Sequence, residues 1–186
     1  MQCMNSQRNS TKTATDSLRA LVALGANLDS PAGAPTDTLI VVIEQLHSWS
    51  IGAFAASSVY RSSPENCPEG SPDFVNAVVS LQLPGDTEAE HFLDRLLALE
   101  QEYGRQRGEP ANAPRPLDLD LIAFGEWQQV SDALTLPHPR FHQRRFVLEP
   151  LAELDPRLVL PPHRETVSQL LQPLLSEQRC TRVALP

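Results

Sequence analysis

The spacing of apolar residues switches along this chain between the pattern of a β-strand and that of an α-helix, and the order of these patterns is what most limits how it can fold. Leu18–Asn27 is a short apolar run that ends in a turn, and Phe74–Leu83 alternates apolar with polar residues, so both are predicted as β-strands. Thr36–Trp49 contains an apolar run with strand propensity, but its apolar residues also repeat at the i, i+3, i+4, i+7 spacing of an amphipathic helix. Because Thr36 or Asp37 can cap such a helix, we predict a helix there.

The remaining segments complete an ordered alternation of strands and helices. We predict strands over Ile51–Arg61 and Arg115–Gly125, and a helix over Asp86–Gly104 that ends at its glycine. The order strand, helix, strand, strand, helix, strand is that of a ferredoxin-like β-α-β-β-α-β core, an α+β fold whose antiparallel sheet carries two helices on one face. The residues that follow form a C-terminal extension, punctuated by prolines, with a helix around Thr166–Leu175.

Length, charge and cysteine content restrict the class of protein. We expect a disordered leader over residues 1–17 and one domain over residues 18–186, since the first residues are polar and no later linker divides the chain. No apolar run is long enough for a membrane span, and a net charge of −8 disfavours nucleic-acid partners. Three scattered cysteines fit a reducing cytoplasm better than a disulfide or zinc framework. We expect a cytoplasmic monomer.

Two aspartates stand where a strand normally avoids them. Asp118 and Asp120 alternate with leucines, so their carboxylates share one face, roughly 7 Å apart at about 3.3 Å per residue. Such like charges need a solvated surface, an arginine or a metal ion to neutralise them. Six of the arginines fall between Arg105 and Arg145. Carboxylates that can hold Mg²⁺, surrounded by arginines, are the equipment for polyphosphate chemistry.

Several stretches together resemble one family. "SSVYRSSP", "SPDFVNAVVSL", "APRPLDLDLIAFG" and "LPHPRFHQRRFVLEPLAEL" are similar, in order, to segments of the 6-hydroxymethyl-7,8-dihydropterin pyrophosphokinases, and the likeness runs from about Leu21 to Pro156. The resemblance implies a ferredoxin-like core. It also implies transfer of pyrophosphate from ATP to the hydroxymethyl group of a dihydropterin, with release of AMP, in folate biosynthesis.

The resemblance also implies a role for individual residues. Asp118 and Asp120 match two Mg²⁺-binding aspartates, with two ions expected. Phe74 and Phe146 match the aromatic residues that sandwich the pterin, and Asn76 matches the asparagine that hydrogen-bonds its edge. The remaining matches are the residues that line ATP and its phosphates, with Arg105 and Arg115 also expected to act in catalysis: Glu100, Arg105, Arg107, Arg115, His138 and Arg144.

One departure from the family pattern and three alternatives stay open at this point. The segment Ala111–Arg115 lacks the arginine and tryptophan that the family commonly carries there, which puts closure of that loop in question. Another Asp-x-Asp enzyme such as a nucleotide-sugar transferase, a nonenzymatic ferredoxin-like binding module and a catalytically weakened paralogue are the competing interpretations.

Overall fold

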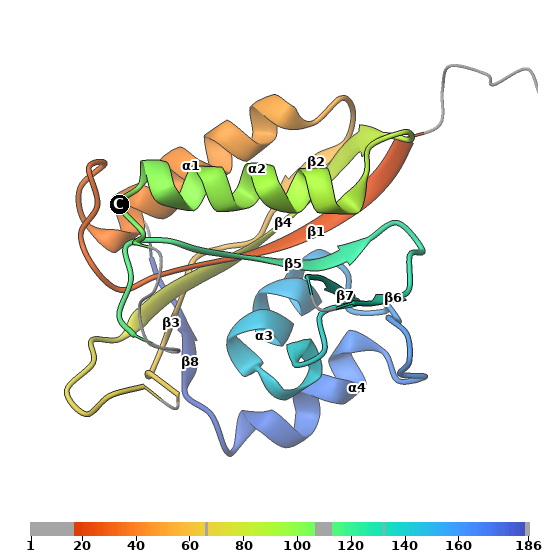
Figure 1. Cartoon of the computed structure of the whole chain (residues 1–186). Coiled ribbons are helices and arrows are strands. Elements are labelled where there is room, and N and C mark those ends of the chain that lie inside the picture. The colour runs from red at the N-terminus through yellow and green to blue at the C-terminus, as the bar shows by residue number, and fades with distance from the viewer. Residues whose placement is uncertain (1–16, 66, 107–112, 132, 185–186) are drawn as a thin grey trace, which may run out of the picture.

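A computed structural model describes residues 17–65, 67–106, 113–131 and 133–184. Its centre is an antiparallel β-sheet with helices packed on both faces (Figure 1). The predicted leader lies outside the described residues except for Ser17, which is the first residue of β1. Within the described ranges, no helix combines the length and the apolar content that are needed to cross a membrane.

The sheet has its longest strands at its centre. Strand order is β5-β1-β4-β3-β8, with β2 also paired to β4, and every neighbouring pair is antiparallel. The strands of this sheet are β1 (Ser17–Ala26), β2 (Phe54–Ala56), β3 (Tyr60–Ser62), β4 (Phe74–Pro84), β5 (Asp118–Phe124) and β8 (Cys180–Arg182). A separate hairpin joins β6 (Gln129–Val130) to β7 (Thr135–Leu136). The antiparallel sheet and the strands predicted at β1, β4 and β5 are confirmed.

The prediction of one continuous strand over Ile51–Arg61 is wrong, because the segment forms two short strands. Pairing with β4 runs from Ala56 opposite Val79 to Tyr60 opposite Asn76, so the three residues 57–59 between these pairs are opposed by only the two residues 77–78. At this bulge the Ser57 hydroxyl accepts a hydrogen bond from the Val78 N–H at 3.0 Å. The side chain therefore takes a position that backbone normally fills, and the strand bends.

Helices α1 (Pro35–Trp49) and α2 (Ala89–Glu102) lie side by side on one face of the sheet (Figure 1). Their apolar stripes pack against alternate residues of β1, β4 and β5, and this buried cluster includes the leucines at 117, 119 and 121. Both helices and the covered face of β5 were predicted. Proline stands at the start of α1, and Gly104, with φ of 96°, ends the turn after α2, as helix-terminal chemistry favours.

The second face of the sheet is covered too, and this corrects the expectation of helices on one face only. Helix α3 (Arg145–Leu154) and the short α4 (Val167–Leu171) pack a second apolar cluster against it, including Val78 and Ile122. Helix α3 was not predicted, because Pro150 lies inside it and a proline normally ends a helix. The helix predicted around Thr166–Leu175 is confirmed as α4, capped by the Thr166 hydroxyl, followed by a 3-10 turn over Gln172–Leu175.

A single carboxylate holds α3 to the bulged edge of the sheet. Glu153 accepts hydrogen bonds from the Ser58 N–H at 3.0 Å, the Ser58 hydroxyl at 2.8 Å and the Tyr60 hydroxyl at 2.9 Å. Burial raises the pKa of the Glu153 carboxyl, but these hydrogen bonds outweigh it and the net pKa is lowered. The ionised group therefore stabilises the docked helix.

Replacing Glu153 with alanine should lower the free energy of unfolding by about 1–3 kcal/mol, because the Tyr60 hydroxyl and the Ser58 groups lose their acceptor. Denaturant unfolding monitored by circular dichroism measures this loss. Glu44→Ala, on the exposed side of α1, is the matched control and should change little. Equal effects of the two substitutions would contradict the assigned role of Glu153.

Candidate active site

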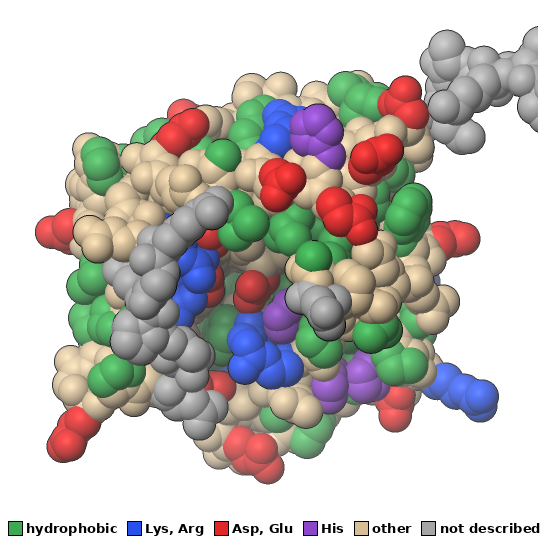
Figure 2. All heavy atoms as spheres, viewed as in Figure 1, with side chains coloured by type: hydrophobic (Ala, Val, Ile, Leu, Met, Phe, Trp, Pro, Cys, Tyr) green, Lys and Arg blue, Asp and Glu red, His purple; other side chains and the backbone are tan. Residues whose placement is uncertain are grey.

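Polar side chains gather on the α3 face of the sheet, at the end that the second apolar cluster does not reach. Asp118 lies opposite Gly25, which lies opposite Asn76, so these residues form one row across β5, β1 and β4. Side chains in such a row share a face, and residues two positions away do as well. Phe74, Asn76, Asp118 and Asp120 therefore face the same side, as expected. Figure 2 shows this side of the molecule hollowed, with acidic, basic and histidine side chains around the hollow.

Gly25 has no side chain, so the space between Asp118 and Asn76 stays open. A Cβ atom at this position would lie 3.4 Å from Asn76 Oδ1 and 3.9 Å from both the Asp118 Cβ and the Phe74 Cδ1. Any larger side chain would then fill the space above these contacts. The site needs glycine here for room rather than for backbone freedom.

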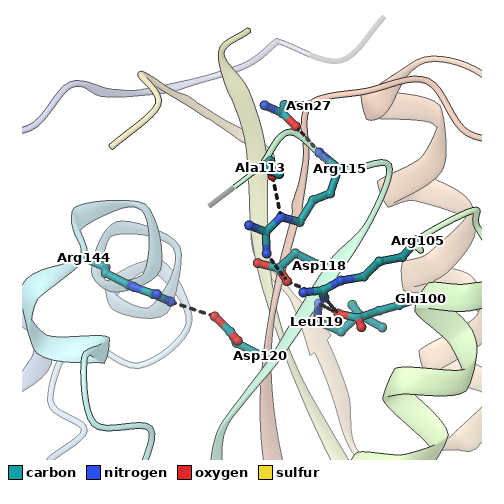
Figure 3. A network of polar contacts seen from close by, with 9 residues as sticks. All are labelled: Asn27, Glu100, Arg105, Ala113, Arg115, Asp118, Leu119, Asp120 and Arg144. Atoms are coloured by element: carbon teal, nitrogen blue, oxygen red, sulfur yellow. Dashed lines mark hydrogen bonds and ion pairs between the residues drawn. The ribbon is translucent and has the colours of Figure 1, made fainter. Parts of the chain in front are cut away.

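Arginines neutralise both aspartates (Figure 3). Asp118 Oδ1 accepts hydrogen bonds from Arg105 Nη1 at 2.6 Å and from Arg115 Nη1 at 3.1 Å. Asp120 Oδ2 accepts one from Arg144 Nη1 at 2.7 Å, and this arginine comes from the segment just before α3. Of the three ways to neutralise the pair that the sequence left open, this structure shows arginine pairing. Three separate chain segments thus converge on one strand.

Glu100 supports the network from below. It lies in α2 with only 2% of its surface exposed, and it accepts hydrogen bonds from the Leu119 N–H at 2.7 Å and from Arg105. Arg105 is thus shared between Glu100 and Asp118. Burial raises the pKa of Glu100 to about 7, although the Leu119 N–H and the Arg105 charge act in the opposite direction.

A pocket of about 310 Å³ adjoins the network between α2, β5 and the β6–β7 hairpin. Its polar wall contains Glu100, Arg105, Asp118, Asp120 and His138, and leucines of α2 and β5 form its apolar wall. The His138 N–H donates to the Ile122 carbonyl at 2.8 Å, and its Nδ1 accepts from the Arg140 N–H at 3.2 Å. Burial is the main cause that lowers the pKa of His138, while Asp120 opposes it and Arg144 adds to it. The imidazole is therefore held neutral beside the carboxylates.

A second part of the site lies around Asn76, which is buried. Its Nδ2 donates to the Ser62 hydroxyl at 3.0 Å and toward the Tyr60 carbonyl at 3.5 Å. Because a carbonyl oxygen only accepts, the amide nitrogen must face it, and the amide oxygen is directed toward Gly25 instead. The Tyr60 carbonyl thus fixes the orientation of this amide, and the Ser62 hydroxyl adds a second acceptor for its nitrogen.

Two half-buried aromatic residues complete the predicted set, one beside Asn76 and one beside Arg144. Phe74 begins β4, two residues before Asn76, and Phe146 lies in the first turn of α3 with the Arg144 guanidinium 5.5 Å from its ring centre. The structure therefore brings the predicted ring, amide and arginine residues onto one face. Arg107, also predicted for this site, lies outside the described residues.

The two aspartates suit a magnesium ion that arrives with a nucleotide. Among the described residues, no group of three or more histidine, cysteine, aspartate or glutamate side chains is arranged to hold a metal ion. Mg²⁺ is commonly held by one or two carboxylates, with phosphate and water oxygens completing its octahedron. In the contacts between described residues, each aspartate pairs with arginine through one of its two oxygens. Asp118 and Asp120 thus fit such an ion.

The antiparallel sheet flanked by helices is a mixed α and β fold, and its carboxylates and arginines beside a pocket are suited to an enzyme that acts on phosphate groups. Residues 21–156 match the family model of 7,8-dihydro-6-hydroxymethylpterin-pyrophosphokinase, and the chain belongs to this family. This finding agrees with the resemblance seen in the sequence.

Curated relatives and solved structures support the assignment. The chain is 38% identical to the 2-amino-4-hydroxy-6-hydroxymethyldihydropteridine pyrophosphokinase of Synechocystis sp., over 82% of this chain and 74% of the relative. The enzymes of the same name from Haemophilus influenzae and Pseudomonas aeruginosa are 34% and 39% identical, over 83% and 78% of this chain and 92% and 86% of theirs. A wild-type Plasmodium falciparum HPPK-DHPS structure with SDX-DHP has a TM-score of 0.61 at 11% identity, over 87% of this chain and 45% of that one. The latter supports the fold alone, and this chain spans a little under half of its length.

Glu100 makes the stability of the protein depend on pH. A carboxyl whose pKa is raised on folding binds its proton more tightly in the folded state, so its contribution is full below about 4.5 and declines as the pH rises to about 7. Wild type should therefore lose, between pH 4.5 and 7, on the order of 3 kcal/mol that Glu100→Gln does not lose, at about 1.4 kcal/mol per pKa unit. Denaturant unfolding at pH 4.5 and 8 measures the difference.

Glu102→Gln, on the exposed side of the same helix, is the control and should keep the pH dependence of the wild type. If Glu100→Gln also keeps the pH dependence of the wild type, the Glu100 carboxyl is ionised throughout this range. The Arg105 charge then lowers its pKa by more than burial raises it.

Proposed function

We propose that this protein transfers pyrophosphate from ATP to the hydroxymethyl group of 6-hydroxymethyl-7,8-dihydropterin, giving AMP and the pterin diphosphate, as a step of folate biosynthesis. The observation that carries the proposal is the paired network in which Arg105 and Arg115 meet Asp118, with a pocket beside it. Family membership and the names of the bacterial relatives support it.

Arginines on three segments prepare the phosphate end of the site. Arg105, Arg115 and Arg144 each present a rigid guanidinium that suits phosphate oxygens, and each is already held near the aspartates at 2.6–3.1 Å. A bound triphosphate would offer these groups a second anionic partner. Their charge would then stabilise the transferred and the leaving phosphates as negative charge develops on them.

Asp118 and Asp120 would hold magnesium, with two ions proposed, together with the triphosphate. When bound, the metal supplies charge neutralisation on the phosphates and a lower pKa for the attacking hydroxyl. The chain itself supplies position: both carboxylates lie on one rigid strand, and Glu100 fixes Arg105 beside them. The nucleotide would occupy the adjoining pocket, against His138 and the leucines of α2.

The pterin would lie on the other side of the aspartates. The Asn76 amide oxygen, directed away from Ser62 and Tyr60, would accept an N–H from the pterin edge. The rings of Phe74 and Phe146 offer flat apolar surfaces for stacking on the bicyclic ring and for exclusion of water. The hydroxymethyl group would then point toward the row that contains Asp118.

We also propose the finer points of organisation. The strand order β5-β1-β4-β3 supports a ferredoxin-like core, with α3, α4 and β8 as an extension that folds back onto it. Because β8 pairs with β3 and both apolar clusters share one sheet, residues 18–186 are proposed as a single domain. The negative net charge supports small-molecule partners rather than nucleic acid. A cytoplasmic monomer remains the expectation.

Incubation with ATP, Mg²⁺ and the dihydropterin should yield AMP, detected by chromatography. Asp118→Asn and Asp120→Asn should each lower turnover by about 100-fold or more while the protein remains folded, because each loses one anionic ligand for the metal. Asp94→Asn, exposed on α2, is the control and should be as active as wild type. ADP in place of AMP would exclude pyrophosphate transfer. Near-normal turnover in either site variant would exclude the aspartate assignment, and a weakened paralogue would show correct products at a low rate.

Phe74→Ala and Phe146→Ala should each weaken pterin binding by about 1–3 kcal/mol, the scale of stacking on a base, which corresponds to about 5- to 150-fold in Kd. Binding of a nonhydrolysable ATP analogue should change little, because the nucleotide pocket has other walls. Isothermal titration with each ligand measures both effects. Phe54→Ala is the control, since that ring stacks on His47 outside the site. Equal losses for the two ligands would indicate that the rings serve packing only.

A further inference from the structure

Asn27 lies just past β1 and links two segments that reach the site from different directions. Its side chain is 4% exposed. The Oδ1 atom accepts a hydrogen bond from the Arg115 N–H at 2.7 Å, a contact drawn in Figure 3, and Nδ2 donates to the Pro72 carbonyl at 3.2 Å. One buried amide is thus satisfied by two partners that lie 88 and 45 residues away along the chain.

The contact with Arg115 fixes the backbone from which this arginine projects. Besides the side-chain bond, the Asn27 and Leu28 N–H groups both donate to the Arg115 carbonyl, at 3.1 and 3.3 Å. The guanidinium then has little freedom, because its Nε donates to the Ala113 carbonyl at 3.0 Å and its Nη1 to Asp118. Both backbone polar groups of Arg115 are therefore held by the end of β1.

The contact with Pro72 acts on the opposite side of the site. Pro72 stands two residues before Phe74, the ring that begins β4. Proline has no N–H, so its carbonyl is the only backbone group of this residue that can form a hydrogen bond. The Asn27 amide takes that carbonyl and so sets the approach of the chain to Phe74.

We propose that Asn27 is a positioning residue that fixes the spacing between Arg115, at the phosphate end, and Phe74, at the acceptor end. The inference rests on the proposed function for the identity of these two ends. An amide is required because one atom of this side chain must donate to the Pro72 carbonyl while the other accepts from the Arg115 N–H. An aspartate would keep the acceptor for the Arg115 N–H and lose the donor to Pro72. An alanine would lose both.

The two substitutions should affect the reaction differently. Asn27→Ala should lower kcat by roughly 10- to 100-fold, more than it changes either KM, because misplacement of the reacting groups costs rate on that scale. Asn27→Asp should raise KM for the pterin several-fold and leave KM for MgATP close to the wild-type value. Asp29→Asn, exposed on the same turn, is the matched control and should leave all three constants unchanged.

Steady-state kinetics of the full chain, with thermal unfolding as a check on folding, test these expectations. Hydrogen exchange measured by mass spectrometry gives a readout that needs no turnover. Protection of segment 113–117 should fall in Asn27→Ala and persist in Asn27→Asp, whereas segment 71–75 should lose protection in both. Wild type without AMP production would sink the proposed function and leave this exchange test standing.

Two results would overturn the inference itself. The first is Asn27→Ala with wild-type kinetic constants and wild-type exchange in both segments. The second is an equal change of both KM values in Asn27→Asp, since that variant keeps the bond to Arg115. Should Asn27→Ala fail to fold, Asn27→Asp decides alone, and an unchanged KM for the pterin in it would refute the role.

Discussion

Repulsion between two carboxylates on one strand is the constraint on which the rest of this site depends. Asp118 and Asp120 project from β5, the outermost strand on its side of the sheet, and their like charges repel each other. Arginines from three segments of the chain pair with the two aspartates, so the negative charge is compensated without being removed. Removing the carboxylates would relieve the repulsion and would also remove the ion pairs that bring these arginines together at this edge.

The buried Glu100 adds a second layer to this balance. It draws Arg105 down toward α2 while Asp118 draws the same guanidinium toward the hollow, so the arginine is shared between a dry and a half-exposed acid. Because burial favours the protonated form of Glu100, the grip of that acid on Arg105 depends on pH, whereas Asp118 is the more exposed partner. The position of Arg105 thus joins the packing of a core helix to the electrostatics of the cleft.

Local periodicity predicted the central elements of the fold, since alternation in β4 and β5 and the helical repeats of α1 and α2 are written in neighbouring residues. It placed both aspartates on the face shared with Phe74 and Asn76. It missed α3, where tertiary packing tolerates Pro150, and the bulge, where Ser57 replaces a backbone partner. Alternation and the clustering of arginines singled out Asp118, Asp120 and the arginines around them, whereas the resemblance to a family supplied Phe74, Asn76, Glu100, His138 and Phe146.

The hydrogen bonds that link distant segments around the site could not be predicted from local periodicity. Asn27 and Ser62 lie within stretches that resemble the family, but their partners are distant in sequence or on a neighbouring strand, so the sequence assigns them no contact. Arg105, Arg115 and Arg144 were recognisable as a group, yet which of them meets which aspartate depends on how three segments are packed. Long-range pairing of this kind is visible only in three dimensions.

The last strand of the sheet, β8, supports the surroundings of Asn76. Cys180 of β8 pairs with Ser62 of β3, and the Ser62 hydroxyl accepts a hydrogen bond from the Asn76 amide. Trimming the chain before β8 would therefore remove the strand that pairs with Ser62, and with it part of the support for the Asn76 amide. In this molecule the boundary of a usable fragment is set by strand pairing one strand away from Asn76.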